Sequence, residues 1–203
     1  GSSLQLTYHS CDCEENYPGN LDVKVIYTLS EDNEIEIDYY AIADQDTVVN
    51  LTNHAYFNLS GHKAGDICKH ELMICADRFT AINHEGIPTG EIKTVTGTPM
   101  DFTKLTPIEY GINCEDEQIR FGKGYDHNWV FNVSGKKPEK AAELFDPASG
   151  RVMEVYTTKP GIQFYSGNFL DGLDIGKDGA IYIRRSGLCL ETQYFPNSMK
   201  HKH

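Results

Sequence analysis

The sequence predicts an all-β domain in which antiparallel sheets pack face to face as a sandwich. Three observations support this prediction. Short runs rich in β-branched and aromatic residues recur along the chain. Clusters of Gly, Pro, Asn and Asp separate these runs, and helical periodicity is almost absent. Many short strands at close spacing are typical of a sandwich or barrel.

The first predicted element is a hairpin. Val23–Leu29 and Glu34–Ile42 alternate apolar with polar positions, and the turn residues Ser30–Asn33 join them. A turn or two of helix is expected over Leu105–Tyr110. We find no repeat and no linker composition, so a single domain over residues 1–203 is expected. The remaining predicted strands are Thr47–Leu51, Glu71–Ala76, Asn128–Val133, Val152–Thr157, Ile162–Tyr165, Ala180–Arg184 and Leu188–Gln193.

Composition excludes several classes of partner. The 18 Lys and Arg residues stand against 30 Asp and Glu, which leaves a net charge of -12. Such a chain has no basic stripe for a nucleic acid, and its field repels anionic membrane surfaces and heavily phosphorylated ligands. A neutral ligand meets no such repulsion. No apolar run approaches the roughly 18 to 20 residues that cross a bilayer.

The cysteines and glycosylation motifs bear on the cellular compartment. The six cysteines are scattered and do not show metal-binding or redox spacing, so we expect free thiols in a reducing cytoplasm. Asn-x-Ser/Thr motifs begin at Asn50, Asn58 and Asn132. Each lies in or beside an apolar run where a glycan would disturb sheet packing, so we interpret them as chance occurrences.

Four segments place polar side chains inside apolar or aromatic runs. Burying such groups without partners costs roughly 1 to 3 kcal/mol each, so the segments indicate an internal network or a wet cleft. A sugar cleft would suit them, with aromatic faces from Tyr56, Phe57, Trp129, Phe164, Tyr165 and Tyr194. The segments are NLTNHAYFNLSG (50–61), GYDHNWVF (124–131), PGIQFYSGNFLDG (160–172) and GLCLETQYFPNS (187–198).

Each segment alone has an ordinary structural explanation. A single histidine in a strand, such as His54, is more often structural than catalytic. Asp126 and His127 alone favour a turn with a side-chain cap. Glu191 alone could belong to a buried ion pair, and Gln163 could satisfy backbone amides. Five further histidines lie in polar, loop-like contexts typical of a solvated surface: His62, His70, His84, His201 and His203.

Taken together and in this order, the segments resemble the aldose 1-epimerase (galactose mutarotase) family. LTNHAYFNL is similar to the signature around the family's catalytic histidine, and LETQYFPNS to the segment with its catalytic glutamate. YDHN and PGIQFYSGNFLDG are similar to its sugar-binding segments. The lead-in EENYPGNLDVKVIYTL extends the resemblance to nearly the whole chain. The resemblance implies the family's large antiparallel supersandwich.

The resemblance also implies roles for four residues. His54 would be the general acid that protonates the sugar ring oxygen, and Glu191 the general base that removes the anomeric hydroxyl proton. Asp126 and Gln163 would bind sugar hydroxyls. No cofactor and no metal is implied. We expect the His54 imidazole and the Glu191 carboxylate to lie about 4 to 8 Å apart across a pocket of ligand size.

The chain also departs from the family pattern. The family's N-terminal Asn-Arg pair, its second sugar-binding histidine and its closing C-terminal strands have no counterpart here. We therefore expect exposed strand edges that favour self-association, and activity near the uncatalysed background for this chain alone. The alternatives to an aldose 1-epimerase are a non-catalytic sugar-binding sandwich, an interaction domain and a hexose-6-phosphate epimerase. The last would need Arg or Lys at the cleft, and the four segments are almost free of both.

Overall fold

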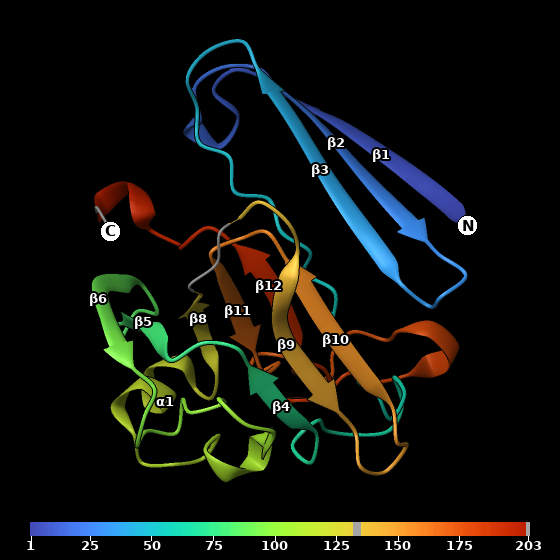
Figure 1. Ribbon diagram of the computed structural model, residues 1–203, viewed down its shortest axis with the longest axis vertical. Helices are drawn as coiled ribbons and strands as arrows, with labels where there is room; N and C mark the ends of the chain where they lie inside the picture. Colours follow the sequence, from blue (N-terminus) through green and yellow to red (C-terminus); the bar gives the residue numbers. More distant parts are fainter. Residues whose placement is uncertain (132–134, 202–203) are drawn as a thin grey trace. The chain divides into compact units, whose positions relative to one another are not determined.

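The computed structural model describes residues 1–131 and 135–201. Internal contacts divide the chain into two compact units, Gly1–Leu51 and Thr52–His203 (Figure 1). Each unit is described by itself. The expected single domain stays a prediction.

The first unit is a three-stranded antiparallel sheet. Its order is β1-β2-β3, with a short 3-10 helix at Glu14–Asn16. The predicted hairpin is confirmed: the Ser30 hydroxyl accepts the backbone N–H groups of Asp32 and Glu34, and Asn33 adopts a left-handed φ of 61°. The strands are β1 (Ser2–Ser10), β2 (Leu21–Leu29) and β3 (Ile35–Ala43).

The second unit contains two antiparallel sheets. One has five strands in the order β12-β11-β8-β5-β6, and the other has four in the order β10-β9-β4-β7. The five-stranded sheet comprises β5 (Arg78–Ile82), β6 (Pro88–Thr94), β8 (Asp126–Val130), β11 (Gly161–Tyr165) and β12 (Cys189–Gln193). The four-stranded sheet comprises β4 (Glu71–Ile74), β7 (Thr106–Pro107), β9 (Glu139–Phe145) and β10 (Val152–Thr157). The helical pieces are α1 (Glu117–Gly122) and 3-10 turns at Ile108–Tyr110, Lys177–Gly179 and Ser198–Lys200.

One hydrophobic core joins these two sheets. Trp129 and Phe164 from the five-stranded sheet and Leu72 and Leu144 from the four-stranded sheet are completely buried in the same cluster. Phe102 packs between them, with its ring centroid 5.9 Å from that of Trp129 and 5.7 Å from that of Phe164. The predicted all-β sandwich class is confirmed.

Two predicted strands are wrong. Thr47–Leu51 has no regular structure, and Ala180–Arg184 contributes only an isolated bridge between Ile181 and Ile175. Both contain exposed apolar side chains, including Val48 and Ile183. The β-branched side chains of these two segments therefore do not pack within a sheet. A composition that favours strands is not sufficient to form one without a partner strand.

The helical prediction is confirmed in its second half, where Ile108–Tyr110 forms a single 3-10 turn. Its first half is corrected, because Thr106–Pro107 forms the two-residue strand β7. The one α-helix in the described part of the chain is α1, which we did not predict. The Asp116 carboxylate caps it by accepting the N–H groups of Gln118 and Ile119. A six-residue helix is too short to show a periodic pattern.

Other predictions concern exposure and compartment. All six cysteines are free, as predicted. His70 is not on the surface: it is buried, and its Nε2 accepts the Leu59 N–H at 3.0 Å. The last residues of the predicted strand Asn128–Val133, the motif at Asn132, and His203 lie outside the described residues. Within residues 1–131 and 135–201, no helix is long and apolar enough to cross a bilayer.

Candidate active site

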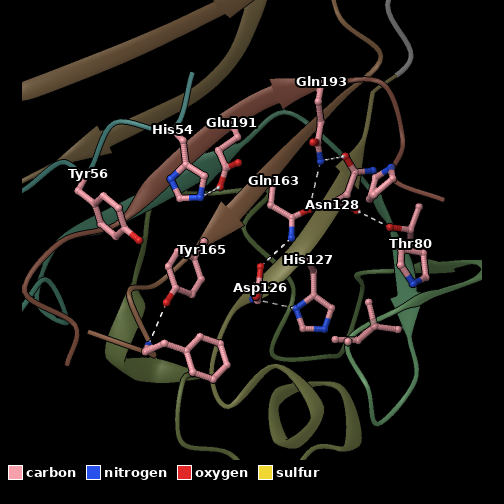
Figure 2. A pocket seen from close by; sticks show the side chains of 15 residues that line it. His54, Tyr56, Thr80, Asp126, His127, Asn128, Gln163, Tyr165, Glu191 and Gln193 are labelled. Atoms are coloured by element: carbon pink, nitrogen blue, oxygen red, sulfur yellow. Dashed lines mark hydrogen bonds and ion pairs between the residues drawn. The ribbon is translucent and has the colours of Figure 1, made fainter. Parts of the chain in front are cut away.

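Three neighbouring strands of the five-stranded sheet build the floor of the site. Trp129 on β8, Phe164 on β11 and Leu190 on β12 point into the core. Because side chains alternate along a strand, the residues next to each of them on its own strand face the opposite side of the sheet. The register then aligns the polar residues. Gln163 on β11 lies opposite Asn128 on β8 and Glu191 on β12. Polar side chains from distant parts of the sequence therefore meet on one face (Figure 2).

His54 reaches this face from a loop rather than from a strand. Thr52 anchors the loop by donating its hydroxyl to the Thr192 carbonyl at 2.9 Å. Phe57 anchors its other end through two backbone hydrogen bonds with Leu188. Both anchors lie on or beside β12, so the loop is attached to the strand that carries Glu191.

The structure brings His54 and Glu191 together. His54 Nε2 lies 3.5 Å from Glu191 Oε1, which is closer than expected. The His54 side chain is 55% exposed, whereas the Glu191 side chain is 10% exposed. The partly exposed His54 imidazole therefore contacts the buried Glu191 carboxylate, and the two form an ion pair when His54 is protonated.

Asp126 and Gln163 lie on the same face of the sheet and form a direct hydrogen bond. The Gln163 amide donates to Asp126 Oδ1 at 2.8 Å. Asp126 and His127 belong to β8, so the predicted turn at this pair is wrong. His127 is completely buried, and its Nδ1 accepts the Asp126 N–H. All four predicted site residues are therefore close together.

Sequence reasoning missed two amides of the same floor. Gln193 Nε2 donates to Gln163 Oε1 at 3.2 Å and to Asn128 Oδ1 at 3.3 Å. A Cβ atom at Gly161 would come within 2.6 Å of Asn128 Oδ1 and within 2.9 Å of the Trp129 carbonyl oxygen, so a glycine is required beneath this amide. Alternation offered a signal, because Gln193 follows Glu191 by two residues and shares its face.

The floor opens into a cavity of about 470 Å³. Tyr56 and Tyr165 line it as predicted, with their ring centroids 5.4 and 6.4 Å from that of His54. The prediction that four other aromatic rings line the cavity is wrong. Trp129 and Phe164 are completely buried in the core, against which Phe57 also packs. The Tyr194 ring instead makes a cation–π contact with the Lys159 ammonium group, which lies 4.5 Å from the ring centroid. The cavity is also lined by Thr80, Ile82, Gly86, Pro88, Phe169 and Pro196, none of which we predicted.

Burial sets the electrostatics of the two carboxyl groups. It raises the pKa of Glu191, the Asp126 charge adds to this rise, and His54 opposes it. Burial also raises the pKa of Asp126, while the Gln163 hydrogen bond and His54 lower it. Both carboxyl groups therefore hold protons more tightly than a solvated carboxyl group, which makes them stronger bases when ionised.

Three side chains at the site have donor atoms suited to a metal ion. The ligand atoms of His54, Cys189 and Glu191 all lie within 4.8 Å of one another. Imidazole, thiolate and carboxylate are the usual ligands of Zn²⁺. However, burial raises the pKa of the Cys189 thiol strongly, so a metal would first have to displace a tightly held proton. The absence of a metal requirement stays a prediction.

Comparison with known proteins agrees with this geometry. The family model described as aldose 1-epimerase matches residues 1–203. The chain belongs to the aldose 1-epimerase family. A galactose mutarotase from Mus musculus is 50% identical over 198 residues, and one from Homo sapiens is 46% identical over 198 residues; each alignment covers 98% of this chain and 56% of the relative. An aldose 1-epimerase from Escherichia coli (strain K12) is 39% identical over 192 residues, covering 95% of this chain and 55% of the relative.

Solved structures support the family's fold. A GalM/aldose epimerase homologue from C. elegans superposes with a TM-score of 0.84 at 28% identity, covering 97% of this chain and 57% of the other. Galactose 1-epimerase from Lactobacillus acidophilus gives a TM-score of 0.83 at 28% identity, covering 96% and 55%. The chain thus spans somewhat more than half the length of these aldose 1-epimerase family members.

Proposed function

We propose that the protein is an aldose 1-epimerase, an isomerase that interconverts the α and β anomers of hexoses such as galactose and glucose. One observation carries the proposal: His54 Nε2 and Glu191 Oε1 lie 3.5 Å apart at a cavity of ligand size. The contact places an imidazole, which can give a proton, beside a carboxylate whose pKa is raised by burial and which can take one.

The chemistry needs one proton supplied and one removed. Glu191 takes the proton of the anomeric hydroxyl while protonated His54 gives a proton to the ring oxygen. The bond between the anomeric carbon and the ring oxygen breaks, and an open-chain aldehyde forms. After rotation about the bond to the anomeric carbon, closure on the other face returns both protons to their original donors.

The rest of the floor suits sugar hydroxyls. Asp126 accepts hydrogen bonds, whereas Gln163 can both donate and accept them. Tyr56 and Tyr165 present aromatic edges and faces to the apolar side of a pyranose. The ionisable lining consists of carboxyl groups, histidines and tyrosines, so it favours a neutral hexose over a sugar phosphate.

We also propose that the protein acts in the cytoplasm. Six free cysteines, with no disulfide, fit the reducing cytoplasm. Self-association through the sheet edges stays a prediction that sedimentation can measure.

The test is polarimetry of fresh α-galactose and α-glucose with the full-length protein. We expect His54→Ala and Glu191→Gln each to lower kcat by about a hundredfold to ten-thousandfold, because each removes a positioned acid or base. The exposed neighbours His84→Ala and Glu85→Gln serve as matched controls and keep the parental rate. Parental rates in both site variants would exclude the mechanism, and sugar binding without turnover by the parent would favour a non-catalytic sugar-binding protein.

A further inference from the structure

The two ring nitrogens of His54 face different groups. Nε2 lies 3.5 Å from the Glu191 carboxylate, and Nδ1 lies 3.4 Å from the Cys189 sulfur. Cys189 is completely buried on β12, two residues before Glu191. One strand therefore presents a thiol to one side of the imidazole and a carboxylate to the other.

The reaction needs only one of these nitrogens to exchange its proton. If protonated His54 delivers a proton from Nε2, the neutral ring that remains must keep its proton on Nδ1. That Nδ1–H then needs an acceptor, and the Cys189 sulfur is placed to be one, although sulfur accepts weakly. Burial keeps the thiol neutral by raising its pKa, and the charges of Glu191 and Asp126 add to this effect.

We propose that Cys189 is a positioning residue that retains the Nδ1 proton of His54, so that Nε2 is the nitrogen that exchanges a proton with the sugar. This inference rests on the proposed epimerase function. It assigns to Cys189 the orienting role that a carboxylate or carbonyl plays for many other histidines.

A neutral partner has a chemical consequence. A carboxylate at Nδ1 would stabilise the imidazolium and make it a weaker proton donor. The thiol orients the ring without adding negative charge on that side. The negative charge lies instead near Nε2, where the proton is exchanged. The titratable groups that face the ring are Glu191, Asp126, Tyr56, Tyr165 and Cys189 itself.

The direct test is ¹⁵N NMR of the histidine rings in the protein, with His54→Ala used to assign the signals. We expect the neutral His54 ring of the parent to carry its proton on Nδ1. Cys189→Ser keeps an acceptor and should keep this tautomer. Cys189→Val keeps the position filled with an apolar side chain but removes the acceptor, and should shift the population toward the Nε2–H tautomer. An Nε2–H ring in the parent, or an unchanged tautomer in Cys189→Val, would overturn the proposal.

Kinetics of the full-length protein provide the second readout. We expect Cys189→Val to lower kcat by about 10- to 100-fold with a smaller change in KM, and Cys189→Ser to recover most of the loss. Cys189→Asp should move the basic limb of the kcat profile upward by about 1 to 2 pH units, because a carboxylate favours the imidazolium. An unmoved limb in a folded Cys189→Asp protein counts against the proposal. A parent without anomer exchange would instead refute the proposed function, and the tautomer measurement would still report on the Cys189 contact.

Discussion

Burial raises the pKa of Glu191, the residue that we propose as the general base. Its side chain is 10% exposed, and the neighbouring Asp126 charge adds to the effect of burial. Both influences raise the pKa of Glu191 above the ordinary value of 4.5, while His54 acts in the opposite direction. The acid limb of the activity profile should therefore lie at a higher pH than a solvated glutamate would give.

This assignment predicts how the acid limb responds to Asp126. As pH falls through the raised pKa of Glu191, the base becomes protonated and kcat is lost. Asp126→Asn removes a charge that raises this pKa, so the acid limb should move to lower pH by up to about one unit. Polarimetry of the full-length protein across the acid range measures the shift at saturating sugar. Asp32→Asn, at an exposed turn of the first unit, is the control, and identical limbs in all three proteins would contradict the assignment.

At the scale of an element, strand β8 carries a buried histidine beside the site. His127 is completely buried between the rings of Phe79 and Trp129, at centroid distances of 6.0 and 6.4 Å. Burial lowers the pKa of His127 to about 3. Its Nδ1 accepts a backbone hydrogen bond, so the folded protein holds the neutral ring with its proton on Nε2.

His127 should make the protein sensitive to acid. Between its ordinary pKa of 6.5 and its folded pKa of about 3, the unfolded chain binds a proton that the folded chain does not. The free energy of unfolding therefore decreases as pH falls through this window, by up to about 1.4 kcal/mol per pH unit. His127→Asn keeps an acceptor for the Asp126 N–H and removes the titration, so its slope should be flatter. Urea unfolding at several pH values measures the slopes, with exposed His84→Asn as control; equal slopes in His127→Asn and the parent would contradict the prediction.

At the scale of the whole molecule, the core and the candidate site belong to one unit. The core cluster and the residues that line the cavity all lie within Thr52–His203. We therefore expect a chain that begins at Thr52 to unfold cooperatively, with its single tryptophan, Trp129, still buried. Its melting temperature should remain within about 5 °C of that of the second unit in the longer chain.

Tryptophan fluorescence during thermal unfolding tests this expectation. A blue-shifted emission that changes in one sharp transition is the expected result. Phe102→Ala removes a ring packed 5.9 Å from Trp129 and should cost about 3 to 5 kcal/mol, which provides a destabilised comparison. A red-shifted emission from the shortened but otherwise unchanged chain would show that the first unit is needed for the core to form.

The pattern of the sequence predicted part of this arrangement and missed another part. Val152–Thr157 was predicted with its observed bounds, because it is rich in β-branched and aromatic residues. Strand β9, with the sequence Glu-Lys-Ala-Ala-Glu-Leu-Phe, was not predicted, since its residues are mostly good helix formers. Pairing with β4 and β10 overrides that preference. The rejected strands at 47–51 and 180–184 show the reverse case, in which β-favouring composition has no partner strand.

The fold class, the family motifs and the alternation of faces along the strands that were recognised follow from the order of the amino acids alone. Alternation alone separates Gln163 from Phe164, and Glu191 from Leu190. Which of these faces meet depends on how the strands pair in the folded chain. The register that places Gln163 opposite Glu191, and the loop anchors that bring His54 to Glu191 and Cys189, depend on contacts between residues far apart in the chain. Such contacts cannot be predicted from a local pattern in the sequence, because the hydrogen bonds that form them join segments far apart in the chain.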